Sequence, residues 1–333
     1  MFDQLFKRRA TGLQTAPSES GSSLHASLDE LISLRLQARQ IRFGRYAASA
    51  NLLAGNHASR FKGRGMDYLE SRFYQPGDDI RNMDWRITAR TQQPHVKLFQ
   101  EERERPVIIM TDLNRSMFFA SRGQFKSALA CRTAALLAWS AVNNGDRIGG
   151  LIANSQHIEL QPKGGKRGVL AYLQQLATHS QPKHALFEQS DIQPHINESF
   201  NRLLRLARPG SLVFILSDFY RLDEHSRQQL SRLKHNAELV LLRLQDPLEN
   251  TAPPPNRYVV SDGRNQAVLN TRDQTVLHDY GQWFQQRQSL IQDISRQLAI
   301  PLLTLSTTDD ALSRLQQLFS HFETRQKHWR RHR

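Results

Sequence analysis

The stretch Pro106-Val-Ile-Ile-Met-Thr-Asp-Leu-Asn-Arg-Ser116 decides the fold prediction, because a short apolar run ends in an aspartate and polar residues. Such a continuous apolar run is typical of a strand buried on both faces of a parallel sheet. Ser211-Leu-Val-Phe-Ile-Leu-Ser217 repeats the pattern and ends at Asp218. Because parallel strands end at one edge of a sheet, we expect neighbouring strands that bring Asp112 and Asp218 together.

Segments of helical and strand character alternate around these two runs. Further strands are predicted at 147–153, 157–161, 237–244 and 301–305, with a small extended pair near 257–270. Helices are predicted at 124–143, 167–178, 197–208, 223–236, 275–299 and 309–321. The alternation predicts an α/β domain over residues 106–322, with a mostly parallel sheet and helices on both faces.

The ends of the chain differ from this domain in composition. Residues 1–24 contain a Ser/Gly-rich segment with few large apolar groups, which predicts a flexible leader. Residues 25–105 are predicted to hold a first helix, which starts near Ser27, and a small loop-rich or β subdomain. Residues 323–333 form a basic tail.

One segment of the small subdomain concentrates charge within a few residues. Tyr74-Gln-Pro-Gly-Asp-Asp-Ile-Arg-Asn-Met-Asp-Trp85 carries three carboxylates, two turn-forming residues and a tryptophan. Together with Asp112-Leu-Asn-Arg-Ser116 it resembles one family, the bacterial domain of unknown function 58. Members of that family accompany MoxR-type AAA+ ATPases and join this signature to a von Willebrand factor A-like domain. The resemblance runs from about Gly63 to the C-terminal helices and implies a von Willebrand factor A-like, Rossmann-like fold.

The resemblance also implies a metal-ion-dependent adhesion site at the strand ends. Asp112, Ser116 and Asp218 match its pattern, while Asn114 stands where a serine belongs. The loop taken as its second element, residues 162–168, has no threonine and carries Lys166 and Arg167. Three interpretations stay open: a Mg²⁺ site, a metal-free rim in which Lys166 or Arg167 neutralises the aspartates, and an Asp112 that merely orders its turn.

The charged segment has three interpretations of its own. Its residues are Arg72, Gly77, Asp78, Asp79, Arg81, Asp84, Trp85, Arg90 and Lys97, called the Gly-Asp-Asp signature below. Arginines are numerous enough to pair every carboxylate, which favours a structural salt-bridge cluster that joins the small subdomain to the A-like domain. A partner-binding epitope is second, and a catalytic carboxylate cluster is third.

Composition and missing motifs exclude several classes of protein. The net charge of +14 comes from basic chain ends and scattered arginines, so no specific nucleic acid is expected. The sequence has no phosphate-binding Gly-rich loop, no Gly-x-Ser-x-Gly and no zinc-binding His pattern. Cys131 is the single cysteine, and its Ala-rich surroundings favour a buried hydrophobe. No apolar run reaches the about 18 residues of a membrane span, and a cytoplasmic location is expected by default.

These observations predict a non-enzymatic adaptor with chaperone-like activity. The resemblance implies that it works with a MoxR-type AAA+ ATPase to mature or assemble complexes of an unidentified target protein. The alternative is a metal-dependent phosphodiesterase or nuclease that uses Asp78, Asp79 and Asp84. A third interpretation, a peripheral membrane scaffold, rests on Phe2, Leu5, Phe6 and the basic residues 7–9.

Overall fold

A six-stranded sheet forms the centre of the molecule. The computed structural model describes residues 23–41, 66–101, 104–183, 196–261 and 266–330. The strand order is β10-β7-β6-β3-β4-β5, and every pair is parallel except β4 with β5. The strands are β3 (Pro106–Asp112), β4 (Arg147–Ala153), β5 (Ile158–Lys163), β6 (Ser211–Ser217), β7 (Ala237–Gln245) and β10 (Leu302–Ser306).

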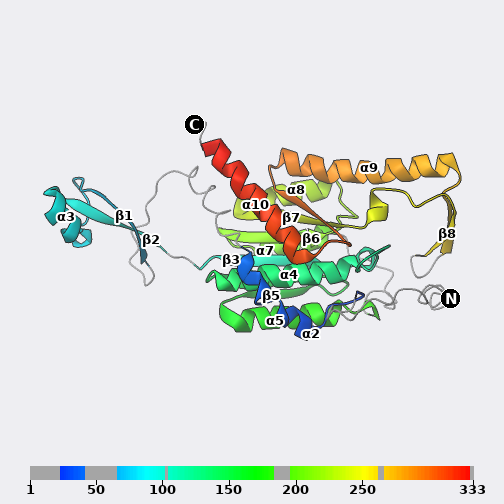
Figure 1. The fold of residues 1–333 in the computed structure, drawn as a ribbon, viewed down its shortest axis with the longest axis horizontal. Coiled ribbons are helices and arrows are strands. Elements are labelled where there is room, and N and C mark those ends of the chain that lie inside the picture. The colour runs from blue at the N-terminus through cyan, green and yellow to red at the C-terminus, as the bar shows by residue number, and fades with distance from the viewer. Residues whose placement is uncertain (1–22, 42–65, 102–103, 184–195, 262–265, 331–333) are drawn as a thin grey trace.

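Helices cover both faces of this sheet, as Figure 1 shows. One face packs against α4 (Lys126–Asn143), α5 (Gly165–His179) and α10 (Ala311–Arg330). The other packs against α7 (Ile196–Leu206), α8 (Glu224–Asn236) and α9 (Gln274–Gln297). Alternate residues of each strand enter the two cores: Val107 and Ile109 lie on the α4 side, and Ile108 and Met110 on the α9 side.

The predicted α/β fold with a mostly parallel sheet is therefore confirmed, and its architecture fits a von Willebrand factor A-like fold. β3 and β6 are direct neighbours, with Thr111 paired with Leu216. Both strands run in the same direction, so the expected shared edge for Asp112 and Asp218 is also confirmed.

The first helix packs on the α/β core. α2 (Leu28–Ser33) begins where expected, because the Ser27 side chain accepts a hydrogen bond from the Glu30 N–H. Leu31 is fully buried in the core on the α4 side, and its carbonyl accepts from Trp139 Nε1 at 3.0 Å. A short 3₁₀ turn, η1 (Gln37–Gln40), extends the same contact. This helix thus shares its core with the α/β domain, although the sequence analysis placed it in one region, residues 25–105, with the small subdomain.

A separate hairpin unit, residues 66–101, carries the Gly-Asp-Asp signature. β1 (Met66–Phe73) and β2 (His95–Glu101) pair antiparallel, with η2 (Ile80–Asn82) and α3 (Trp85–Thr91) between them. The unit precedes the amino-terminal end of β3, and Figure 1 shows it apart from the large sheet. A second hairpin, β8 (Arg257–Ser261) with β9 (Gln266–Asn270), precedes α9.

Several sequence predictions fall at the chain ends. Residues 1–22 and 331–333 lie outside the described residues, so the leader and the membrane-scaffold residues near Phe2 stay predictions. α10 continues to Arg330, so residues 323–330 of the predicted basic tail are helical. Across the described ranges, no helix is long and apolar enough to cross a bilayer.

Candidate functional site

The predicted aspartates meet at the carboxyl edge of the sheet. We call residues 112–121, 217–220 and 246–249 the strand-end rim; the last group contains η4 (Pro247–Glu249). Asn114 donates to Asp112 Oδ1 from its backbone N–H at 3.0 Å and from Nδ2 at 2.8 Å. The Ser116 hydroxyl bonds to the carboxylate of Asp218. The four residues proposed from the adhesion-site pattern are therefore brought together.

A strained turn after β6 links the two carboxylates. Ser217 Oγ donates to Asp112 Oδ2 at 2.6 Å and accepts from the Phe219 N–H at 2.9 Å. Phe219 is in the left-handed region, with φ of 53°, which is unfavourable for a bulky side chain. The next N–H, of Tyr220, donates to Asp218 Oδ1 at 3.0 Å. The turn thus fixes both aspartates and places Tyr220 at the surface.

A buried lysine balances the charge of Asp218. Lys126 is the first residue of α4, and its side chain is 2% exposed. Its Nζ lies 2.8 Å from Asp218 Oδ2 and 2.7 Å from Glu249 Oε1. A cation at a helix N-terminus opposes the helix dipole, so the two carboxylates must offset this cost as well as that of burial. We call Lys126, Asp218 and Glu249 the lysine core.

The pKa values follow from burial and from this pairing. Burial, and then repulsion from Asp218, raise the pKa of Asp112 to about 6. Burial alone would raise the pKa of Asp218, but the charge and hydrogen bond of Lys126 outweigh it and lower that pKa. The pKa of Lys126 is raised, because the two carboxylates outweigh its own burial. Asp218 and Lys126 are therefore both charged at neutral pH.

The residues at the rim do not fit a Mg²⁺ ion. Mg²⁺ needs several free oxygen ligands in near-octahedral geometry. Asp218 Oδ2 is instead held by an ammonium, and both oxygens of Asp112 accept hydrogen bonds from Asn114 and Ser217. Within the described residues, no group of three His, Cys, Asp or Glu side chains is arranged to hold a metal. A cation at this position would have to displace Lys126.

The expectation that Lys166 or Arg167 neutralises the rim is wrong. Both side chains are exposed at the start of α5, directly after β5. Because β5 runs antiparallel to β4, its last residue, Lys163, pairs with Ile148 at the start of β4. The 162–168 loop therefore lies at the opposite edge of the sheet from Asp112. Lys126 takes the neutralising role instead.

The outer layer of the rim is aromatic and basic. Tyr220 is 45% exposed and Trp283 of α9 is 43% exposed, and their ring centroids lie 5.8 Å apart. The Arg287 guanidinium lies over both rings, 3.9 Å from the Tyr220 centroid and 4.7 Å from that of Trp283. Phe119, in the loop after β3, is similarly exposed. Neither the lysine core nor this layer was predicted.

One sequence signal could have identified Lys126. It is one of two charges, with Arg132, in the Ala-rich segment that forms α4, and it stands at the helix end where a cation is unfavourable. Such a lysine needs a carboxylate partner to be tolerated. No comparable local signal marks Glu249, Trp283 or Arg287, because only the tertiary fold brings them to the rim.

The Gly-Asp-Asp signature has mainly local roles in the hairpin unit. Gly77 adopts φ of 106° in the turn before η2. Asp78 pairs with Arg72 at 2.7 Å and accepts from the Gln75 N–H. Asp79 caps η2 by accepting from the Arg81 N–H at 3.0 Å. The turn and η2 are thus set by these side chains.

Asp84 is the buried member of the signature. It caps α3 by accepting from the Ile87 N–H, and Ser71 Oγ donates to it at 2.7 Å. The Ser71 hydrogen bond, with the helix N–H groups and Lys97 adding to it, lowers the pKa of Asp84. Trp85, the first residue of α3, is 65% exposed, and Arg90 lies near the exposed end of the helix.

These contacts correct the salt-bridge interpretation. Of the three signature carboxylates, Asp78 alone pairs with an arginine among the described contacts. The partners of all three belong to the hairpin unit itself. The signature therefore stabilises this unit and does not tie it to the α/β domain through these carboxylates. Each carboxylate has a separate local role, which also gives no support to a shared catalytic cluster.

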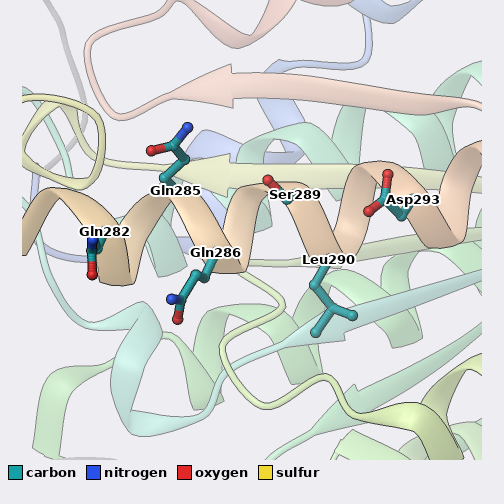
Figure 2. Close-up of a pocket in the computed structure, with 6 residues that line it drawn as sticks. All are labelled: Gln282, Gln285, Gln286, Ser289, Leu290 and Asp293. Atoms are coloured by element: carbon teal, nitrogen blue, oxygen red, sulfur yellow. The ribbon is translucent and has the colours of Figure 1, made fainter.

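Two other features carry no site. His157 Nε2 lies 3.0 Å from Ser199 Oγ, but Ser199 is 1% exposed and out of reach of a substrate. Figure 2 shows an open hollow lined by Gln282, Gln285, Gln286, Ser289, Leu290 and Asp293. All six come from the single helix α9, so the hollow has no opposing wall.

Comparison with known proteins gives one family match. The family model described as "Protein of unknown function DUF58" matches residues 70–289. The uncharacterized proteins Mb1516 of Mycobacterium bovis and Rv1480 of Mycobacterium tuberculosis are each 28% identical over 264 residues. Each alignment covers 79% of this chain and 81% of the relative.

Two solved structures resemble the chain weakly. The conserved hypothetical protein BatB from Bacteroides thetaiotaomicron is 15% identical with a TM-score of 0.43, covering 66% of this chain and 99% of that chain. An uncharacterized membrane spanning protein from Vibrio fischeri is 14% identical with a TM-score of 0.18, covering 65% and 97%. At these TM-scores neither likeness carries an argument.

Proposed function

The chain belongs to the protein family of unknown function DUF58, and on that premise we propose that it is a non-enzymatic adaptor that binds a MoxR-type AAA+ ATPase. In this proposal the ATPase supplies mechanical work, and the chain brings it to a target protein whose complex is matured or assembled. The partner is implied by the resemblance to the family. The position of the strand-end rim in the fold supports this rim as the docking surface.

The exposed layer of the strand-end rim is the observation that carries this proposal. Tryptophan, tyrosine and arginine are the residues most enriched at the energetic centres of protein interfaces. Here the rings of Trp283 and Tyr220 meet edge to face at the surface, and the Arg287 guanidinium lies over both. The carboxyl edge of a parallel sheet is also where open α/β folds place their ligands. Both features favour a binding role for the rim.

The non-enzymatic part of the proposal is supported by how the polar groups are used. At the rim, Asp112 and Asp218 are buried and already hold hydrogen bonds or an ammonium. In the hairpin unit, Asp78, Asp79 and Asp84 act as turn and helix caps. No specific observation favours the phosphodiesterase alternative, so we do not propose it. The cytoplasmic location stays a prediction.

ATPase docking is best tested with a variant of the exposed rings. Replacing Asp112 and Asp218 would disturb a buried charge network, so loss of binding could reflect misfolding. A Tyr220→Ala, Trp283→Ala variant removes exposed rings and leaves the lysine core intact. The matched variant is Ile80→Ala, Trp85→Ala in the hairpin unit, where both side chains are similarly exposed.

The experiment measures binding of the purified MoxR-type ATPase to immobilised wild type and both variants, with ATP and with ADP. We expect the rim variant to lose at least about tenfold in affinity, which corresponds to truncating one or two interface anchors. The hairpin variant should bind like the wild type. The reverse order would move docking to the signature, and no capture by the wild type would remove the adaptor proposal.

A further inference from the structure

The carboxylates of the strand-end rim already accept hydrogen bonds on both oxygens. Asp218 accepts from Lys126 and from the Tyr220 N–H, and Glu249 accepts from Lys126 and from the Asp246 N–H. Asp246, which is fully buried, accepts from Ser121 on both oxygens and also from Thr307 Oγ1. These acceptors are therefore committed to partners other than arginine.

Two arginines beside these carboxylates lack acceptors of their own. Arg243, near the end of β7, is 7% exposed. Arg287 is partly buried, and its guanidinium lies over the rings of Tyr220 and Trp283. In the described part of the chain, neither guanidinium has a hydrogen-bond or ion-pair partner. Each guanidinium has five N–H donors, and none of them is among the described side-chain nitrogens that are both buried and without a partner, so these donors are open to solvent and to a ligand.

Arg243 pairs in register with Ser217 at the end of β6, and it lies on the same face of β7 as Leu239 and Leu241, which pack on the α9 side where Arg287 is carried. Burial and the charge of Arg287 both lower the pKa of Arg243, and burial lowers that of Arg287. Asp218 and Glu249 partly offset these effects at both arginines by electrostatic attraction, without contacting them. Two like charges whose N–H donors are not taken up by the neighbouring carboxylates form a receptor for an anion.

We propose that Arg243 and Arg287, framed by Tyr220 and Trp283, bind a carboxylate side chain on an acidic segment of a partner polypeptide. The inference deepens the proposed adaptor function and rests on it, because it names the chemistry of the segment that the rim accepts. Contact with two rings holds the Arg287 guanidinium in place, so that its N–H groups can form the two-pronged contact that carboxylates accept.

The aromatic frame favours a polypeptide over a free anion. Tyr220, Trp283 and Phe119 leave exposed apolar surface around the arginines. A polypeptide segment offers carboxylates and apolar side chains together, so it can cover both parts of the site. Inorganic phosphate would satisfy the guanidinium groups but leave the rings in water. The acidic segment therefore has the better overall complementarity.

The test uses two fluorescein-labelled peptides that differ only in charge. One contains glutamates interspersed with leucines, and the other has glutamine at every glutamate position. Fluorescence anisotropy with the full-length chain should show binding of the glutamate peptide, weakened about tenfold or more for the glutamine peptide. Binding should also weaken as salt rises, because the contact is ionic.

Three variants assign the contact to these arginines. Arg287→Lys keeps the charge but loses the planar fork, and we expect a loss of about tenfold in affinity. Arg243→Met should have a loss of similar size, with circular dichroism to confirm folding. Arg296→Gln is the matched control, since Arg296 lies on the same helix, is exposed and pairs with Asp293. Its affinity should equal that of the wild type.

The possible outcomes separate the site from the adaptor function. Equal binding of both peptides, or unchanged affinity in Arg287→Lys and Arg243→Met, overturns the site even if the ATPase is captured. Displacement of the peptide by inorganic phosphate at lower concentrations than by unlabelled peptide also overturns it, in favour of a phosphate site. Charge-dependent peptide binding supports the site, and it still does so if the ATPase fails to bind.

Discussion

The strand-end rim and the hairpin unit both gather aspartates, aromatic residues and arginines, but they use them in opposite ways. At the rim, Asp112 and Asp218 are buried, and a buried lysine supplies the balancing charge. In the hairpin unit, Asp78 and Asp79 lie near the surface and cap local turns. The rim carboxylates therefore depend on the whole α/β fold, while the signature depends on its own neighbours.

This difference shows that a dense charged motif need not mark the chemically unusual site. The signature is the most conspicuous charged segment in the sequence, yet its described contacts are ordinary caps and one ion pair. The rim draws its charges from residues more than a hundred positions apart, such as Lys126 and Glu249. The predictions below test this contrast, from the largest expected effect to the smallest.

Replacing Lys126 by methionine should have the largest effect. The change keeps the length of the side chain but leaves Asp218 and Glu249 without their shared cation inside the protein. Removing one partner of a buried ion pair costs about 3–5 kcal/mol, so we expect a large loss in the free energy of unfolding. Urea denaturation followed by circular dichroism measures it.

The control for this change is Lys163→Met at the end of β5, where the side chain is exposed. That variant should stay within about 0.5 kcal/mol of the wild type. If Lys126→Met proves too unstable to purify, a Lys126→Met, Asp218→Asn double variant should recover part of the soluble yield. A Lys126→Met protein as stable as the wild type would contradict the importance of the lysine core.

Asp112→Asn should have a smaller effect that depends on pH. The folded-state pKa of Asp112 is raised to about 6 from its ordinary value of 3.8, so folding favours its protonated form. Its contribution to stability is fully present below pH 3.8 and is lost as pH rises through about 6. Relative to the wild type, the variant should therefore gain about 1–3 kcal/mol between these pH values and then level off.

Urea titrations of both proteins at several pH values measure this difference. A matched comparison is Asp273→Asn, which replaces an N-cap near the surface at the start of α9. A constant difference between wild type and Asp112→Asn from pH 4 to pH 8 would show that burial and Asp218 do not raise this pKa in the folded protein.

Asp84→Ala should act on the hairpin unit alone. Its removal deprives α3 of a cap and Ser71 of an acceptor, and all its described contacts lie within residues 71–97. We expect backbone amides in the hairpin unit to exchange with solvent roughly tenfold faster, while those of β3 and β4 keep their rates. Hydrogen exchange with mass spectrometry resolves the two regions. Equal acceleration in β3 would show coupling between them.

The sequence alone was sufficient to predict the sheet, because β3 and β6 are continuous apolar runs that end in aspartate. It also placed Asp112, Asn114, Ser116 and Asp218 together, since parallel strands end at one edge. It failed for Lys166 and Arg167, because the chain reverses direction between β4 and β5. An antiparallel β5 carries the next loop to the far edge.

The neutralising lysine and the arginine pair could not be predicted in the same way. Lys126 reaches Asp218 only because α4 packs directly over the end of β6. Arg243 and Arg287 come from β7 and α9, and only the packing of α9 on this face of the sheet brings the two elements together. Periodicity identifies each element but does not determine which of its polar residues will face another element.

Addition of Mg²⁺ should produce the smallest effect. A ligand that binds the folded state alone raises stability by RT ln(1 + [L]/Kd), so even millimolar affinity would be visible at about 10 mM Mg²⁺. Because Lys126 holds Asp218, and Asn114 and Ser217 hold Asp112, we expect no change in the melting temperature of the wild type and little heat in calorimetry. Micromolar affinity that is lost in Asp112→Ala would contradict this expectation. It would also erase the contrast between the two regions, since a resident cation, and not the lysine, would then neutralise the rim.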